Sequence, residues 1–323
     1  MKALCVFSGG LDSMLASQII RAQGIDVLGL FFETPFFSSH RAKISAKAIQ
    51  LPLKVIDLTE PHLEVVKHPA HGYGGNMNPC IDCHALMLRK AGQMLEEEGA
   101  AFVITGEVLG QRPMSQNLKA LSIVATQSGF PRLIWRPLSA KLLQMTLPEE
   151  RGWVQRDLLL NFSGRSRKPQ MELARKLNIT DYPSPAGGCL LTDPIFSRRL
   201  KDLLSNETNF EIREIELMKV GRHFRLGPHT RLVVGRNKGE NETIASFARP
   251  EDLLLFAQSA PGPTVLALGP FTQEIELLAA RITASYSDAK EGESTEVKLS
   301  AKGEEKTVSV EKPSKGEFQK MMI

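Results

Sequence analysis

Short apolar runs alternate with amphipathic stretches through the first half of the chain. The runs have the length of buried strands, and the stretches between them carry apolar residues at helical spacing. The predicted strands are residues 3–7, 27–32, 53–58, 102–106 and 133–135, and the predicted helices are residues 13–23, 40–50 and 85–98. Strands that alternate with helices indicate a parallel sheet covered on both faces. We therefore predict a doubly wound α/β fold that binds its ligands at the carboxyl ends of the strands.

The pattern changes twice in the second half of the chain. After residue 138 it becomes more helical, and a polar stretch at residues 205–209 then precedes runs with β character. A chain of 323 residues is also too long for a comfortable single core. The predicted parts are an α/β domain, a helical extension and a smaller C-terminal α+β domain, at residues 1–138, 139–206 and 207–323.

Residues 287–315 can be interpreted in two ways. The segment is charged and rich in Gly and Ser, which is typical of disordered chains. Residues 295–299 and 307–310 nevertheless alternate between apolar and polar side chains, as edge strands do. Both interpretations remain open on the sequence.

A glycine turn follows the first predicted strand and opens the first predicted helix. Two adjacent glycines, Gly9 and Gly10, let the backbone turn tightly and approach an anion. The hydroxyls of Ser8 and Ser13, with the amides of the helix N-terminus, can hold phosphate oxygens. Asp12 would be repelled by a polyphosphate unless it caps the helix, orients Mg²⁺, or both. The pattern predicts a nucleotide site; the alternative is a serine-capped helix after an ordinary turn.

Composition and charge narrow the class of protein. Apolar residues make up 42% of the chain and the net charge is +4, so charge alone does not indicate a nucleic-acid partner. No apolar run has the length of a transmembrane helix, and the N-terminus lacks the apolar segment of a signal peptide. We therefore expect a cytoplasmic protein with no membrane partner. In a reducing compartment its four cysteines would be metal ligands, catalytic thiols or buried residues rather than disulfides.

Three of the cysteines belong to motifs that can bring thiols together. Cys80 and Cys83 form a C-x-x-C pair at a predicted helix N-terminus, which lowers thiol pKa values, and Cys189 follows two glycines. The thiols could hold zinc with His84, hold an iron–sulfur cluster with one open iron, act as redox thiols, or be unrelated. The C-x-x-C-H spacing also matches haem attachment, which a cytoplasmic location argues against. Cys5, inside the first strand, is expected to be a buried core residue.

The glycine turn resembles the SGG-x-DS signature of the pyrophosphate-loop ATPases, which cleave ATP between its α and β phosphates and adenylate a substrate. Other stretches resemble the tRNA 4-thiouridine synthetases and the neighbouring 2-thiouridylases. The first family is matched by residues 31–42, by the T-G-E-x-L-G-Q motif with the following Ser-Gln at residues 105–116, and by Arg-Pro-Leu at residues 136–138. The second is matched by Asn-Pro-Cys at residues 78–80 and Gly-Cys at residues 188–189. The resemblance covers about residues 1–205.

This resemblance implies an adenine nucleotide alpha-hydrolase-like, Rossmann-like fold and an ATP-dependent tRNA sulfurtransferase. Such an enzyme binds ATP and Mg²⁺, adenylates a uridine and replaces its carbonyl oxygen with sulfur; 4-thiouridine is the expected product and 2-thiouridine the alternative. Asp12 and Cys189 are implied as catalytic residues. The residues implied in ATP binding are Ser8, Gly9, Gly10, Asp12, Ser13, Gly106 and Gln111. The chain departs from typical 4-thiouridine synthetases because it lacks their N-terminal RNA-binding region and the rhodanese domain that some of them carry.

The cysteine pattern resembles thiolation enzymes that hold a [4Fe-4S] cluster by three protein ligands. It implies Cys80, Cys83 and Cys189 as metal ligands, with a free iron that binds hydrosulfide. The alternatives are Zn²⁺, or no metal and a persulfide on Cys189 that Cys80 or Cys83 attacks. The sulfur donor would be sulfide or a cysteine desulfurase.

Residues 220–226, 233–238 and 284–290 resemble the RNA-binding domain of the NFACT proteins. This resemblance implies that tRNA docks on the C-terminal domain and that residues 287–315 are folded. Cations of this domain, and a second patch at residues 165–168, can contact RNA phosphates without recognising the base sequence. The alternative is that these cations are ordinary solvated surface charges. The candidate RNA-binding residues are Arg165, Arg167, Lys168, Arg222, Arg225, Arg236 and Lys238.

Two other classes of function fit parts of the chain. A small-molecule ligase or amidotransferase of the same ATPase superfamily would adenylate a carboxylate without RNA. A non-catalytic RNA-binding adaptor would use only the C-terminal domain, but the intact glycine turn argues against it. The sequence predicts no particular oligomeric state.

Overall fold

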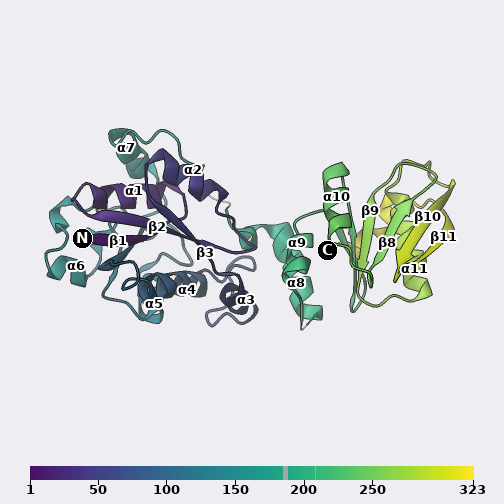
Figure 1. Cartoon of the computed structure of the whole chain (residues 1–323), viewed down its shortest axis with the longest axis horizontal. Coiled ribbons are helices and arrows are strands. Elements are labelled where there is room, and N and C mark those ends of the chain that lie inside the picture. Colours follow the sequence, from purple (N-terminus) through teal and green to yellow (C-terminus); the bar gives the residue numbers. More distant parts are fainter. Residues whose placement is uncertain (185–187, 208) are drawn as a thin grey trace. The chain divides into compact units, whose positions relative to one another are not determined.

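A computed structural model describes residues 1–184, 188–207 and 209–323 of the protein. These residues form two compact units, residues 1–192 and residues 193–323 (Figure 1). Gly187, in the glycine pair before Cys189, and Thr208, in the polar stretch of the predicted boundary, lie outside the described residues.

The N-terminal unit is built on a five-stranded sheet. Its pairings are parallel and its strand order is β3-β2-β1-β4-β5, which confirms the predicted parallel sheet (Figure 1). The strands are β1 (Lys2–Val6), β2 (Asp26–Glu33), β3 (Leu53–Asp57), β4 (Phe102–Thr105) and β5 (Ile134–Trp135). The strand order reverses between β1 and β4, and sheets of this kind bind ligands at that point, beyond the carboxyl ends of the strands.

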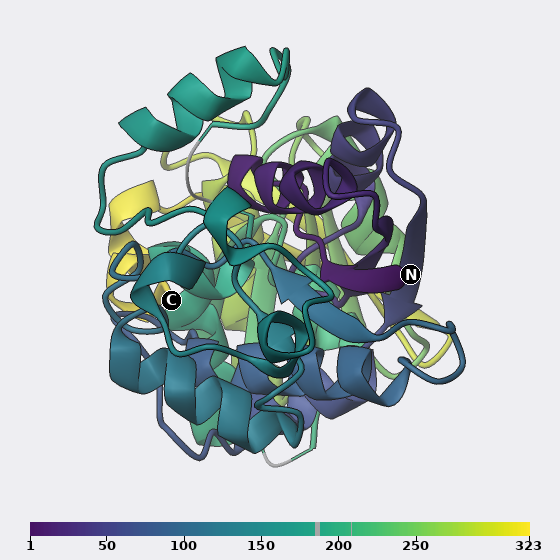
Figure 2. The same cartoon turned by 90° about the vertical axis from the view of Figure 1, so that its left-hand side faces the viewer.

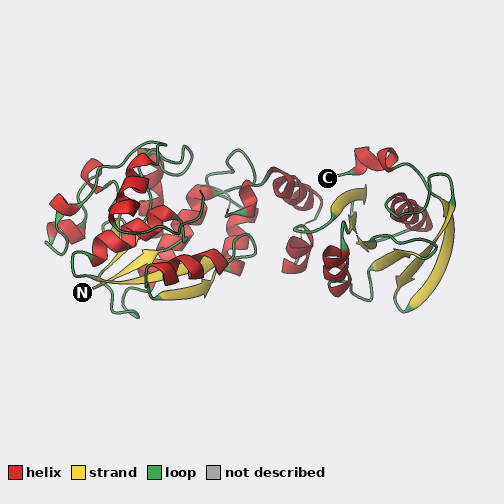
Figure 3. Ribbon diagram, turned by 90° about the horizontal axis from the view of Figure 1, so that it is seen from above, coloured by secondary structure: helices red, strands yellow, loops and turns green. Residues whose placement is uncertain are grey.

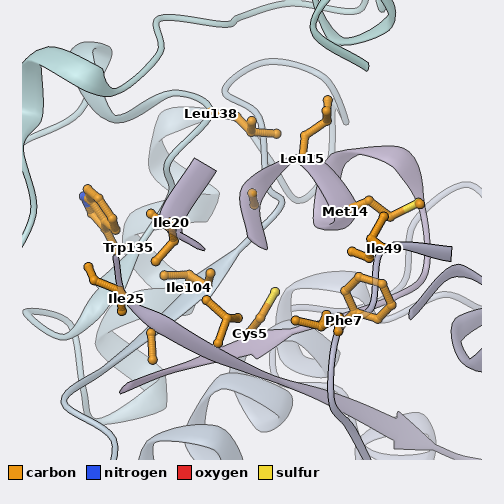
Figure 4. Packing of buried hydrophobic residues seen from close by; sticks show 14 of the residues in the cluster. Cys5, Phe7, Met14, Leu15, Ile20, Ile25, Ile49, Ile104, Trp135 and Leu138 are labelled. Carbon is orange, nitrogen blue, oxygen red and sulfur yellow. The ribbon is translucent and has the colours of Figure 1, made fainter. Parts of the chain in front are cut away.

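Helices cover both faces of this sheet. They are α1 (Leu11–Arg21), α2 (His40–Ala48), α3 (Thr59–Lys67), α4 (Cys80–Gln93), α5 (Leu118–Ser128) and α7 (Lys168–Lys176). Figures 1 and 2 show α1, α2 and α7 on one side of the sheet and α4 and α5 on the other. Neighbouring side chains of a strand point to opposite faces, so Cys5 packs with Met14 of α1 (Figure 4) while Leu4 packs with Leu88 of α4. The prediction that Cys5 is a buried core residue is thus confirmed.

The predicted helical extension shares its core with the sheet. Val154, Leu159 and Ala174 are buried in the same cluster as the apolar residues of α1. Its other helices are short: η1 (Ala140–Leu142), α6 (Leu147–Glu150), η2 (Arg156–Leu158) and η3 (Leu190–Thr192). The next helix, α8 (Pro194–Asn206), lies in the C-terminal unit. The two units therefore divide after Thr192, whereas the sequence placed boundaries after residues 138 and 206.

The C-terminal unit has a six-stranded antiparallel sheet with strand order β11-β10-β8-β9-β7-β6, which confirms the predicted α+β class (Figure 3). Its strands are β6 (Arg222–Gly227), β7 (Thr230–Val234), β8 (Leu253–Ala257), β9 (Thr264–Leu268), β10 (Ser294–Ala301) and β11 (Glu304–Glu311). Its further helices are α9 (Ile212–Leu217), α10 (Lys238–Ser246), α11 (Gln273–Ser285) and η4 (Lys315–Met321).

The segment at residues 287–315 is folded. Its two strands, β10 and β11, pair with each other from Ser294↔Glu311 to Ala301↔Glu304, and β10 also pairs with β8. Val297 and Leu299 of β10 are buried in the core of this unit. The interpretation as strands is therefore confirmed, with β11 at the edge and β10 inside the sheet, and the interpretation as a disordered segment is wrong. No helix of the described residues is long and apolar enough to cross a membrane.

Candidate functional site

The N-terminal unit contains a cavity of about 550 Å³ to which residues near the carboxyl ends of β1 and β4 contribute. Its walls come from the glycine turn, the residues after β4, the first turns of α4 and the segments near Arg165 and Cys189. The lining residues that the sequence singled out are Ser8, Gly10, Asp12, Ser13, Cys80, His84, Gly106, Gln111, Arg165, Arg167 and Cys189. The structure thus brings the predicted ATP-binding residues other than Gly9, and two of the three predicted thiols, to one cavity.

Two glycines allow the backbone to pack closely at this cavity. Gly9 has a φ of +76°, and a Cβ there would lie 2.6 Å from Cα of Ala42. A Cβ on Gly106 would lie 2.5 Å from the backbone N of Ser13, so the residue after β4 touches the first turn of α1. No side chain of the described residues caps α1, which leaves its first amides for an anion.

The two serines of the turn hydrogen-bond within it. Ser13 Oγ donates to the Gly10 carbonyl at 2.8 Å, and Ser8 Oγ accepts from the Gly10 amide at 3.3 Å. The two hydroxyls are 3.4 Å apart. Both therefore stabilise the turn, and a phosphate would have to compete with these contacts for them.

Asp12 is held by a chain of two amide side chains. Gln111 Nε2 donates to Asp12 Oδ2 at 2.6 Å, and Gln170 Nε2 of α7 donates to Gln111 Oε1 at 2.8 Å. Burial raises the pKa of Asp12, while the Gln111 hydrogen bond and the charge of Arg167 lower it. Asp12 Oδ1 is buried without a hydrogen-bond partner among the described residues. The carboxylate is thus fixed in orientation with one free oxygen, as a cation ligand requires.

Three arginines line the same cavity: Arg112, Arg165 and Arg167. The sequence predicted that Arg165 and Arg167 bind RNA. In the structure both lie beside the residues that are predicted to bind ATP. Lys168, the third cation of that predicted patch, begins α7 and does not line the cavity. The arginines give the cavity a positive wall, which suits a polyphosphate.

The thiols differ in their surroundings. Cys80 and Cys189 line the cavity, whereas Cys83 does not, and its Sγ lies 3.2 Å from Nε2 of the buried His62. Asn78 Nδ2 donates to Cys80 Sγ at 3.2 Å. Burial lowers the pKa of His62 to about 4, so that ring is neutral.

Burial dominates the titration of two thiols. It raises the pKa of Cys83, and the Cys189 and Cys80 thiols raise it further, so the three thiols lie within electrostatic reach of one another. Burial also raises the pKa of Cys189 to about 11, although the backbone amides of Leu191 and Thr192 hydrogen-bond to its sulfur. The expectation that a helix N-terminus lowers the thiol pKa is therefore wrong for Cys83, because desolvation outweighs it.

The described side chains around the thiols do not form a site for a single metal ion. No three His, Cys, Asp or Glu side chains of the described residues are arranged to hold a single metal ion. His84, the predicted fourth zinc ligand, hydrogen-bonds through Nδ1 to Glu107 Oε1 at 2.9 Å. Zinc is therefore not supported. A cluster is larger than one ion and its ligands are thiolates, so Cys80, Cys83 and Cys189, with the Asn78 amide donating to the Cys80 sulfur, have the chemistry of cluster ligands.

A buried ion pair in the wall of the cavity was not predicted from the sequence. Glu107 accepts from Arg136 Nε at 2.8 Å and from Thr105 Oγ1 at 3.1 Å, in addition to its bond with His84. Burial raises the pKa of Glu107, but Arg136 and His84 outweigh it and hold the pKa at about 2. Both residues belong to motifs read from the sequence, yet the spacing did not show that they meet. Gln170 was missed as well, because nothing local links it to Asp12.

The predicted RNA-binding residues of the C-terminal unit have different partners. Arg225 forms an ion pair with Asp202, and Arg236 forms one with Glu240. Lys238 Nζ lies 3.9 Å from Glu242. Arg222 instead stacks on an aromatic ring, that of Tyr286.

Two protein families match separate parts of the chain. Residues 1–141 match the family described as thiamine biosynthesis protein (ThiI), and residues 221–322 match the NFACT protein RNA binding domain. The resemblances to the 4-thiouridine synthetases and to the NFACT RNA-binding domain are thereby confirmed.

Relatives of the first part are named as probable tRNA sulfurtransferases. The protein of Thermoanaerobacter sp. (strain X514) is 28% identical over 146 residues, which cover 42% of this chain and 36% of the relative. That of Anoxybacillus flavithermus (strain DSM 21510 / WK1) is 30% identical over 148 residues, covering 42% and 35%. The chain thus spans about a third of the length of these relatives. A solved 4-thiouridine synthetase–RNA complex with bound ATP is 22% identical, covers 55% of this chain and 51% of its own, and has a TM-score of 0.37.

Proposed function

We propose that this chain is an ATP-dependent tRNA sulfurtransferase, which adenylates a uridine and replaces its carbonyl oxygen with sulfur to form 4-thiouridine. One observation carries the proposal: a single cavity is lined by the glycine turn, by three arginines and by two thiols. The match of residues 1–141 and the names of the relatives support the activity, and the match of residues 221–322 supports RNA as the partner.

The adenylation step uses the glycine turn and the charged wall. The first amides of α1 bind ATP phosphates, and Arg112, Arg165 and Arg167 compensate their charge. Asp12, with its free Oδ1, would hold Mg²⁺, which when bound neutralises the phosphates further. The uridine carbonyl oxygen then attacks the α-phosphorus, the bond to pyrophosphate breaks, and the base loses its N3 proton. The chain contributes alignment and charge stabilisation.

The sulfur step uses the thiols. Cys80, Cys83 and Cys189 would hold a [4Fe-4S] cluster, which when bound supplies a sulfur atom at its open iron. Amides of Leu191 and Thr192, Asn78 and His62 are placed to hydrogen-bond to the ligand sulfurs. Replacement of the adenylated oxygen by sulfur releases AMP and restores the N3 proton to the base.

A persulfide on Cys189 is the second way in which these thiols could supply sulfur. It is favoured by the observation that Cys189 and Cys80 line the cavity and Cys83 does not. The terminal sulfur would attack the base, AMP would leave, and Cys80 would attack Cys189 Sγ to release the product. That route ends in a disulfide and needs an external dithiol as reductant.

The function is tested by the dependence of pyrophosphate release on RNA. We expect the purified chain to release pyrophosphate from ATP when unmodified tRNA is added, and to release almost none without it. Release is measured with a coupled phosphate assay, and the matching thionucleoside by mass spectrometry of digested tRNA. Equal release without RNA, or release stimulated by a small carboxylate instead, would contradict the proposal and favour a ligase.

The Cys83→Ser change separates the two sulfur routes. We expect anaerobically purified protein to contain iron and acid-labile sulfide in equal amounts, and the variant to lose both together with thiolation, because a cluster needs all three ligands. Iron analysis, absorbance and nucleoside mass spectrometry measure the outcome. Protein without iron whose Cys83→Ser variant still thiolates would show the persulfide route.

A further inference from the structure

Most of the cations that the sequence gathers in the C-terminal unit are neutralised by carboxylates. The pairs are Arg213 with Asp252, Lys219 with Glu216, Arg225 with Asp202, Arg231 with Glu207, Arg236 with Glu240 and Lys238 with Glu242. A cation that already has such a partner contributes less binding free energy to a phosphate contact, because the carboxylate competes with the phosphate for the cation.

Arg222 belongs to the same stretch of sequence and differs from these cations. Its guanidinium lies 4.9 Å from the centre of the Tyr286 ring, and no carboxylate of the described residues pairs with it. Lys315 Nζ lies 5.7 Å from the centre of the same ring and, within the described part of the chain, also lacks an acidic partner. Two uncompensated cations therefore share one aromatic ring.

The surrounding structure fixes this group. Arg222 is the first residue of β6, Tyr286 directly follows α11, and Lys315 begins η4. The Tyr286 ring packs 6.0 Å from the ring of the buried Phe224. Lys312 adds a third cation nearby, since its Nζ donates to the backbone oxygens of residues 287 and 289. Arg222 and Tyr286 are thus anchored by β6 and by packing against the core of the unit, and Lys315 lies exposed beside them.

We propose that Arg222, Tyr286 and Lys315 form a contact site for a single-stranded stretch of RNA. The two cations bind phosphates of the backbone, and the stack of guanidinium on tyrosine offers a flat surface for an unpaired base. An acidic peptide would bind the two cations, but it has no base to stack on the guanidinium and the ring. The proposal rests on the proposed function, since it specifies how the RNA partner is held.

The test compares two double variants of the full chain in binding to a labelled single-stranded oligouridylate. We expect Arg222→Gln/Lys315→Gln to weaken binding at least about tenfold at roughly 0.1 M salt, and to flatten the slope of log affinity against log salt by about 1.4. The control, Arg249→Gln/Lys306→Gln, removes the same charge from cations that pair with Glu211 and Glu276, and is expected to change affinity less than about twofold.

The ring is tested separately. Tyr286→Phe keeps the aromatic surface and is expected to bind as the wild type does, whereas Tyr286→Leu is expected to lose about five- to tenfold. Because Tyr286 is partly buried, thermal unfolding is measured for both. Lys315→Gln alone changes only an exposed side chain, so this variant is expected to fold as the wild type does.

Each other outcome overturns the inference. Undiminished binding by Arg222→Gln/Lys315→Gln, equal weakening by the control, or competition by polyglutamate as effective as by RNA would each do so. If the wild-type chain shows tRNA-dependent pyrophosphate release while these variants bind RNA normally, only the contact site is wrong. If the wild-type chain binds no RNA, the proposed function fails together with the site.

Discussion

Replacing Cys189 with serine is expected to abolish formation of the thionucleoside while tRNA-dependent pyrophosphate release continues. The Cys189 sulfur is required in either sulfur route, but the adenylation step depends on the glycine turn and the arginines instead. Serine keeps the size of the side chain and can accept the amide hydrogen bonds of Leu191 and Thr192. We expect a loss of at least about 10³-fold in thiolation, since removing a covalent participant leaves only positioning. Nucleoside mass spectrometry and a pyrophosphate assay on one sample measure both steps.

Cys5→Ala is the matched control for this change. It also removes one thiol, but Cys5 lies in the core under α1 and does not line the cavity. We expect it to cost about 1 kcal/mol of stability and to leave thiolation intact. Thiolation by Cys189→Ser, or loss of both steps together, would remove this residue from the sulfur chemistry.

Local pattern was enough to find the glycine turn. Strand, paired glycines and helix start all lie within a short stretch, and each has its own signature in the sequence. The same holds for the parallel sheet, because alternation of strands and helices fixes which pairings are possible. What the turn contacts was not predictable: Gly106 meets Ser13 only because β4 lies beside β1.

The features that the sequence did not predict depend on contacts between residues far apart in the chain. Val154, Leu159 and Ala174 share the core of the sheet, and helical periodicity cannot show which core a helix joins. Gln170 reaches Gln111 across 59 residues of sequence. The cations of the C-terminal unit were visible as a cluster, but their carboxylate partners on α8 and elsewhere were not. For Cys83, the helix N-terminus was visible and the burial that outweighs it was not.

Removing Glu107 is expected to destabilise the N-terminal unit strongly. Glu107 and Arg136 form an ion pair, and each side chain is only 8% exposed. Glu107→Ala leaves a buried guanidinium without its carboxylate, and removal of one partner from such a pair costs about 3–5 kcal/mol. The control is Glu150→Ala, which breaks the exposed pair with Arg132 and is expected to cost at most about 1 kcal/mol.

Tryptophan fluorescence during urea unfolding measures this cost in the N-terminal unit alone, because both tryptophans of the chain, Trp135 and Trp153, lie there. The pH dependence has a definite sign. The pKa of Glu107 is lowered from 4.5 to about 2, so its contribution is complete above pH 4.5 and is lost as the pH falls towards 2. The double change Glu107→Met/Arg136→Met removes both charges and is expected to recover most of the lost stability. If Glu107→Ala unfolds at the same urea concentration as Glu150→Ala, the pair does not stabilise the wall of the cavity, and the close packing of Gly106 against α1 must do so instead.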